Sequence, residues 1–239
     1  MSAPDPAPPV PWRPRIPLWI KLAYTAYVLV LVPVYWHDYG PSNFLYFCDV
    51  ALLMTVPALW LENALLASAA TVGILLPQLL WQIDFLAGLF GASVTGMTDY
   101  MFKPAKPWFT RFLSFFHFWL PLFLVWVVWR LGYDRRALWM WTALAWALML
   151  ICYAWMPGPD PHAEGDPPIN INYVYGFSTS APQTWMPGPL YLAVLMVFLP
   201  AGIFLPTHLL LAKCFGAPRQ ARVSSLRTEP PQVLGEPGA

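Results

Sequence analysis

The sequence predicts an all-helical (all-α) protein: a polytopic membrane bundle of six transmembrane helices with both termini in the cytoplasm. Three observations carry this prediction. Only 10% of the 239 residues are charged and 58% are hydrophobic, whereas soluble domains carry about 25% charged residues. Apolar runs of about 20 residues, the length that crosses a bilayer, recur along the chain. Lys and Arg gather in alternate connecting segments, a pattern typical of membrane topology.

The six expected spans follow from the apolar runs. They cover residues 18–36, 43–61, 64–83, 109–129, 137–155 and 190–211. Residues 43–83 form one apolar stretch, which as a single helix would reach about 60 Å, twice the thickness of the hydrocarbon core. The stretch must therefore fold back, and Glu62-Asn63 is its only polar break. The six spans together form one transmembrane domain over residues 18–213.

The segments at either end of this domain are expected to be disordered. Residues 1–17 are rich in proline, and residues 214–239 form a polar tail rich in Pro and Gly. Six spans place both termini on one side, and the positive-inside rule makes that side the cytoplasm. The inner side then carries most of the basic residues, namely Arg13, Arg15, Lys21, Arg130, Arg135, Arg136, Lys213, Arg219, Arg222 and Arg227. The outer side carries only Lys103, Lys106 and Arg111.

Proline recurs inside the expected spans. The internal prolines are Pro33, Pro57, Pro77, Pro121, Pro200 and Pro206. A proline removes a backbone donor, so the carbonyl four residues earlier needs another partner, which in a membrane must come from a neighbouring group. Two interpretations stay open: kinked helices that close around a polar pocket, or prolines that only shape packing.

The composition also excludes several kinds of partner and site. The net charge of +1 leaves no basic surface of the kind that binds nucleic acid. Cys48, Cys152 and Cys214 are isolated, so no metal site, disulfide framework or cofactor is expected. The expected partners are the lipid bilayer and a lipid or apolar small-molecule ligand. The expected location is the cell membrane, or the inner membrane if the chain comes from a bacterium with two membranes.

Five polar side chains fall at a similar depth in the predicted topology. Asp49, Gln78, Gln82, Asp84 and His117 all lie in the outer half of the membrane. Because Lys and Arg alone set the topology, this shared depth is an independent observation. A carboxylate at mid-helix costs about 2.5–3.5 kcal/mol on insertion scales, so Asp49 should face the bundle interior. These residues predict a polar pocket reached from the outer leaflet.

Asp49 and His117 are the candidate catalytic residues of this pocket. Asp49 would act as a general base or orient His117, and Tyr46, three residues earlier, would donate a hydrogen bond to it. His117, with Ser114 three residues earlier, would act as a base or as a ligand. Pro121 deprives the His117 carbonyl of its usual helical donor. The alternative is that these side chains only hold helices together.

The candidates for substrate binding are Gln78, Gln82, Tyr46 and Ser114. Gln78 and Gln82 share one helix face, where amides either contact a ligand or bond neighbouring helices. Asp84 points away from that face and would cap the helix end or meet Lys103 or Lys106.

Two further features have more than one interpretation. Cys48 lies next to Asp49, but a reactive cysteine needs a nearby cation to lower its pKa. The loop 169–187 begins with alternating Ile and Asn, which suits a short extended lid that presents two amides to one side. The alternative is an interfacial loop anchored by Tyr175 and Trp185.

Two segments resemble a known family. They are Phe44-Leu45-Tyr46-Phe47-Cys48-Asp49, near the start of the second span, and His117 followed by Trp119-Leu120-Pro121-Leu122 in the fourth. Both are similar to segments of the six-span androgen-induced transmembrane lipid hydrolases and of related bacterial six-span membrane proteins. The resemblance covers residues 40–130 and implies the six-span architecture.

The same resemblance implies a role for His117. In that family an intramembrane threonine and a histidine cleave fatty-acid esters of hydroxy fatty acids, and His117 matches the histidine. Tyr46 stands at the threonine position. The resemblance therefore implies the architecture rather than the threonine-dependent chemistry.

Three functions are compatible with these residues. An intramembrane hydrolase or transferase acting on a lipid or another apolar ester would use Asp49 and His117, with Tyr46, Cys48, Ser114 or an activated water as nucleophile. A non-enzymatic protein would bind or transport a small molecule or a proton through the same pocket. In the third, the polar residues only stabilise the bundle.

Overall fold

The computed structural model describes residues 16–104, 106–162 and 168–216, and the regular secondary structure of these residues is entirely helical. The helices are α1 (Leu18–Tyr39), α2 (Phe47–Trp60), α3 (Ala64–Leu89), α4 (Trp108–Leu113), α5 (Phe116–Leu131), α6 (Ala137–Trp155), α7 (Gly188–Phe198) and α8 (Leu205–Phe215). Short turns η1 (Pro41–Leu45), η2 (Asp99–Met101) and η3 (Ile171–Tyr173) lie in the connections, and the π-helical segment η4 (Leu199–Phe204) joins α7 to α8. The two terminal segments predicted to be disordered lie outside the described residues, apart from residues 16–17 and 214–216.

Five helical segments are long and apolar enough to cross a membrane: Leu18–Tyr39, Ala64–Leu89, Trp108–Leu131, Ala137–Trp155 and Gly188–Phe215. The remaining predicted span, 43–61, is divided into η1 and α2 by the extended residue Tyr46. Helix α2 has 14 residues, fewer than the roughly 17–25 that cross a bilayer. The all-helical class and the long apolar helices expected of a membrane protein are confirmed.

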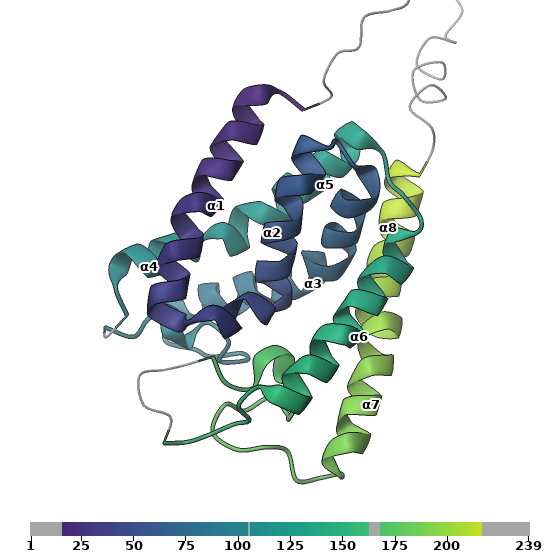
Figure 1. Ribbon diagram of the computed structural model, residues 1–239. Helices are drawn as coiled ribbons and strands as arrows, with labels where there is room; N and C mark the ends of the chain where they lie inside the picture. The colour runs from purple at the N-terminus through teal and green to yellow at the C-terminus, as the bar shows by residue number, and fades with distance from the viewer. Residues whose placement is uncertain (1–15, 105, 163–167, 217–239) are drawn as a thin grey trace, which may run out of the picture.

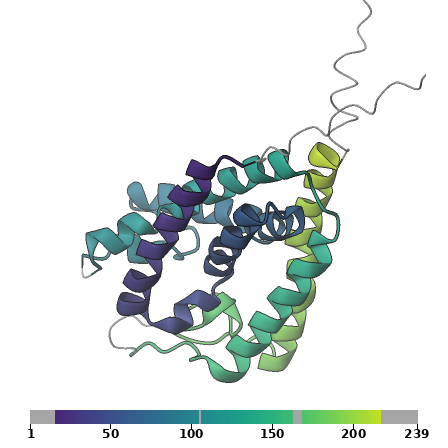
Figure 2. The same ribbon diagram turned by 45° about the horizontal axis from the view of Figure 1, so that its top comes forward.

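Helix α3 lies at the centre of the bundle. It packs against α2, α5, α6 and α8, and Figure 2 shows the blue helices α2 and α3 inside an outline formed by the other long helices. Every residue from Ala67 to Ile74 is buried, so this part of α3 has no exposed face. Helices α1, α2, α3, α5, α6 and the α7–α8 segment alternate in direction, and the described chain starts and ends at the same end of the bundle (Figure 1).

A small residue brings α3 close to α6. Gly73 lies against the indole of Trp141, which is fully buried, and a Cβ atom built on Gly73 would lie 1.7 Å from Trp141 Cε2. Small residues at such positions allow membrane helices to approach closely and to gain packing contacts. Gly73 therefore fixes the distance between the two helices.

The turn between α2 and α3 falls at the predicted polar break. Glu62 adopts a φ of 47°, and the Asn63 side chain caps α3 by accepting from the Leu66 amide at 3.0 Å. The Glu62 carboxylate binds the Lys21 ammonium group at 2.9 Å and accepts the Ile16 amide at 3.2 Å. The two charged side chains are only 8% and 9% exposed, so this ion pair joins the start of α1 to the turn.

The C-terminal helix shows how the bundle accommodates an internal proline. Pro200 has no N–H, so the Met196 carbonyl loses its usual helical donor. Trp146 of α6 takes this role, with its indole Nε1 donating to the Met196 carbonyl at 2.7 Å. The helix continues through Pro200 as the π-helical segment η4, as expected where a neighbouring helix satisfies the freed carbonyl.

The loop after α6 is tightly turned, which differs from the extended lid suggested by its alternating Ile and Asn residues. Asn170 has a φ of 50° and begins the turn η3. Its side chain donates to the carbonyls of Gly176 at 2.7 Å and Ser178 at 2.8 Å, and accepts from the Tyr175 amide at 3.0 Å. The amide side chain of Asn170 is therefore used to shape the loop, because asparagine tolerates the left-handed region and bonds to nearby backbone.

Candidate functional site

A break between α4 and α5 positions His117. The amides of His117 and Phe118 bond to carbonyls three residues earlier, those of Ser114 at 3.2 Å and Phe115 at 3.0 Å. The Ser114 carbonyl therefore lacks the usual amide from four residues later, and His117 Nδ1 lies 2.7 Å from it. Because a carbonyl oxygen only accepts, Nδ1 carries the hydrogen, and the neutral imidazole has its lone pair on Nε2.

Aromatic rings enclose the imidazole of His117. Trp81 of α3 stacks on it with centroids 4.5 Å apart and an interplanar angle of 15°, and Phe116 lies 4.0 Å away. Trp81 in turn stacks on Phe85 at 5.4 Å. His117 is 8% exposed, so the stack fixes the plane of the imidazole ring and leaves little of it open to solvent.

Asp49 lies in the first turn of α2 and is 3% exposed. Its Oδ2 accepts from Asn43 Nδ2 at 3.3 Å and from Cys48 Sγ at 3.6 Å. Within the described residues, Oδ1 has no hydrogen-bond partner. A buried carboxylate is normally paired or fully hydrogen-bonded, so an unpaired oxygen is the kind of group that marks a functional site.

The residues beside Asp49 do not have the contacts that the sequence predicts for them. Tyr46 was expected to donate to Asp49, but it has extended backbone geometry, with ψ of 140°, and lies outside the helix. No hydrogen bond between the two side chains is found in the part of the chain that the structure describes. Tyr46 packs instead against the buried cluster that contains Ile171 and Tyr191. Cys48 has a carboxylate beside it rather than the cation that an activated thiolate needs.

Ser114 belongs to a hydrogen-bond chain that the sequence did not reveal. The Tyr35 hydroxyl lies 2.7 Å from Ser114 Oγ, and Ser114 Oγ donates to the Thr110 carbonyl at 3.1 Å. Because the Ser114 hydrogen is used on Thr110, Tyr35 is the donor to Ser114. Tyr35 also lies within electrostatic range of Asp49. Tyr35 and Ser114 thus form a hydrogen-bonded pair beside His117, which bonds to the Ser114 carbonyl, and no direct hydrogen bond joins Asp49 to His117 among the described residues.

The two glutamines have different surroundings. Gln82 Nε2 donates to the His117 carbonyl at 2.9 Å, the carbonyl that Pro121 leaves without a helical donor. Gln82 thus bonds a neighbouring helix, which is the second of the two roles expected for these amides. Gln78 is 3% exposed, and its Oε1 has no partner in the described residues. Of the two, Gln78 therefore has the acceptor available for a ligand.

The contact of Gln82 makes a prediction about stability. Substituting Gln82→Leu leaves the buried His117 carbonyl unpaired, so we expect a loss of about 1–2 kcal/mol in the free energy of unfolding in detergent. In a Pro121→Ala background, residue 121 regains an N–H that can pair with the same carbonyl. The Gln82→Leu effect should then shrink to a few tenths of a kcal/mol, and equal effects in both backgrounds would contradict the assignment.

Asp84 organises a loop rather than meeting a lysine. Its Oδ1 accepts from the amides of Val94, Thr95 and Gly96 at 2.9, 2.6 and 3.3 Å. Its Oδ2 accepts from the Thr98 amide at 2.9 Å and the Thr98 hydroxyl at 2.7 Å. Five donors converge on one carboxylate, so Asp84 holds the connection after α3 in place and belongs to the scaffold.

A residue outside the predicted site, Asn172, holds the break between η1 and α2. Its Oδ1 accepts from the Phe47 amide at 3.1 Å, and its Nδ2 donates to the Leu45 carbonyl at 2.9 Å. The Phe47 amide is one of the unpaired donors at a helix start, so Asn172 acts as a cap supplied by a distant loop. The sequence shows an asparagine, a residue type that often caps helices. It does not show that this asparagine caps a helix that begins 125 residues earlier.

Comparison with family models, curated proteins and solved structures finds no match to this chain. In the described segments, no three His, Cys, Asp or Glu side chains come together as a potential metal site. The arrangement of Asp49, Tyr35, Ser114 and His117 therefore has to be interpreted from its own geometry.

Proposed function

We propose that this chain is a multi-pass integral membrane protein with six membrane crossings and both termini in the cytoplasm. Two features support the proposal: successive helical segments, α2 included, alternate in direction, and the described chain starts and ends at one end of the bundle (Figure 1). The connection from α5 to α6 lies towards that end (Figure 1), and its sequence includes Arg135 and Arg136. The short helix α2, preceded by η1, would cross with help from the loop that Asn172 anchors.

The activity that we propose is hydrolysis of a lipid or other apolar ester, with His117 as general base. The observation that carries it is the hydrogen bond from Nδ1 to the Ser114 carbonyl, which leaves a lone pair on Nε2 of a buried imidazole. Nε2 would take a proton from a water molecule as the water oxygen bonds to the acyl carbon. The bond from the acyl carbon to the alcohol oxygen then breaks, and the alcohol leaves with the proton from the imidazolium.

Asp49 and Gln78 would assist at the same centre. Each has one buried oxygen without a partner in the described chain, Asp49 Oδ1 and Gln78 Oε1. Such oxygens accept hydrogen bonds from a water or an alcohol, which suits a reaction with an attacking water and a departing alcohol. In the proposed topology, substrate would enter from the outer leaflet.

The test is turnover of long-chain acyl esters by the purified protein in mixed micelles. The decisive variant is His117→Asn, because an asparagine amide can still donate to the Ser114 carbonyl but provides no base. We expect its activity to fall by about 100-fold or more with little change in melting temperature. His162→Ala, an exposed histidine in the loop after α6, is the matched control and should remain active.

A non-enzymatic role is the second candidate, and the contacts of Ser114 and Gln82 favour it, because both side chains donate to backbone carbonyls. In this case wild-type protein cleaves no ester, and Asp49→Asn weakens binding or transport of an apolar small molecule. Ester turnover that survives in His117→Asn would remove the hydrolase proposal.

A further inference from the structure

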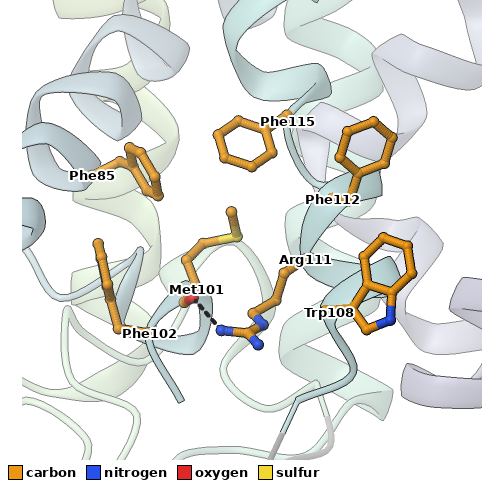
Figure 3. A pocket seen from close by; sticks show the side chains of 7 residues that line it. All are labelled: Phe85, Met101, Phe102, Trp108, Arg111, Phe112 and Phe115. Atoms are coloured by element: carbon orange, nitrogen blue, oxygen red, sulfur yellow. Dashed lines mark hydrogen bonds between the residues drawn. The ribbon is translucent and has the colours of Figure 1, made fainter. Parts of the chain in front are cut away.

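A hollow lies outside the Asp49–His117 site. It has a volume of about 310 Å³ and lies between the end of α3, the turn η2 and helix α4 (Figure 3). Six of its seven lining residues are apolar, including the aromatic residues Phe85, Phe102, Trp108, Phe112 and Phe115. This volume is at the lower end of the roughly 300–1,000 Å³ typical of ligand pockets, so the hollow fits part of a larger amphiphile.

Arg111 is the one charged residue among those seven. Figure 3 shows its guanidinium group reaching between Phe102 and Trp108 towards the Met101 carbonyl, to which Nη1 donates at 3.2 Å. The Nε atom is buried and has no hydrogen-bond partner in the described parts of the chain. A guanidinium group has five donors and pairs best with the oxygens of phosphate or carboxylate groups. The unpaired donor therefore points to an anionic oxygen ligand.

The rim of the hollow is apolar and exposed. Trp108 is 72% exposed and Phe112 is 60% exposed, and both lie on the surface of an apolar helical segment long enough to cross a membrane. Aromatic residues with this exposure are typical of the depth at which headgroups meet acyl chains. A small soluble anion would gain nothing from this rim, whereas a lipid would place its chain along the rings.

We propose that this hollow binds the headgroup phosphodiester of a membrane phospholipid. The phosphate oxygens accept from the guanidinium of Arg111, and one acyl chain lies along Phe112 and Phe115. The site adjoins the candidate active site through Phe85, which stacks on Trp81, and Trp81 stacks on His117. The proposal does not depend on hydrolysis, because it rests on the hollow and its arginine alone.

Binding is measured by native mass spectrometry of delipidated protein in detergent, with phosphatidylglycerol and with diacylglycerol of the same chains. We expect phosphatidylglycerol to bind about tenfold more tightly than diacylglycerol, and Arg111→Gln to remove that preference. Arg135→Gln makes the same charge change at an exposed residue beyond the other end of α5 and should leave binding unchanged. His117→Asn should also bind normally, which separates this site from the proposed hydrolase.

Three results would overturn the proposal. Equal binding of the two lipids would mean that the phosphate is not recognised, and equal loss in Arg111→Gln and Arg135→Gln would mean non-specific electrostatics. Displacement of the lipid by millimolar inorganic phosphate would identify the hollow as a site for a soluble anion. If Arg111→Gln does not fold, Phe112→Asn carries the test, because this exposed ring contacts the chain and its loss should weaken phosphatidylglycerol binding several-fold.

Discussion

Replacing Gly73 with alanine should destabilise the bundle by about 3 kcal/mol or more, the upper range for overpacked cores. The added Cβ would lie 1.7 Å from Cε2 and 2.1 Å from Nε1 of Trp141, well inside van der Waals contact. Trp141 is fully buried, so its indole has no free space to move into. Alanine is the better helix former by about 1 kcal/mol, so the clash has to exceed this gain. Unfolding in detergent measures the net effect.

Gly88→Ala is the matched control for this prediction. A Cβ atom at Gly88 would lie 2.4 Å from Cε2 of Phe102, but that ring is 39% exposed and can move outwards. Its destabilisation should therefore be clearly smaller. In a Trp141→Leu background, where the clashing indole atoms are gone, Gly73→Ala should cost little or even stabilise. Similar losses at Gly73 and Gly88 would show that α3 and α6 are not in such close contact.

Sequence reasoning located the features that depend on the cost of polar groups in apolar surroundings. Glu62-Asn63 was predicted as the turn inside the long apolar stretch, and the structure has the turn there. Pro121 was predicted to leave the His117 carbonyl without its helical donor, and Gln82 pairs with it. Both predictions follow from the requirement that buried backbone groups be satisfied, which can be applied without knowing the fold.

The parts that could not be predicted depend on contacts between residues far apart in the chain. The spacing of Tyr46 and Asp49 places them on one helix face only if both are helical, and the break at Tyr46 removes that condition. The charge of Asp84 predicts an ion pair with Lys103 or Lys106 as one of its two expected roles. In the structure its carboxylate accepts from backbone and hydroxyl donors of residues 94–98. The shared depth of the polar residues along their helices selected them as a set. It could not tell which of their atoms form hydrogen bonds to other parts of the bundle.

The break at Tyr46 leads to the other large prediction, at Asn172. Substituting Asn172→Leu should cost about 4 kcal/mol or more, as the sum of two effects. Loss of the amide leaves the Phe47 N–H and the Leu45 carbonyl without the partners they now have at 3.1 and 2.9 Å. Asn172 also has a φ of 57°, a region where leucine is strained by about 1–2 kcal/mol.

Asn172→Gly separates these two effects, because glycine adopts positive φ without strain but provides no amide. The Asn172→Gly variant should lose about 2–3 kcal/mol of the free energy of unfolding through the missing amide. The Asn172→Leu variant should lose more, and the difference is the backbone strain. Hydrogen exchange gives an independent readout: the Phe47 amide should exchange faster in both variants, while amides in the middle of α6 keep their protection. In the proposed topology α2 crosses the membrane only together with the turn before it, so loosening this cap should also lower the proposed ester hydrolysis at Asp49 and His117. Unchanged exchange at Phe47 in both variants would mean that α2 holds its start without the distant loop.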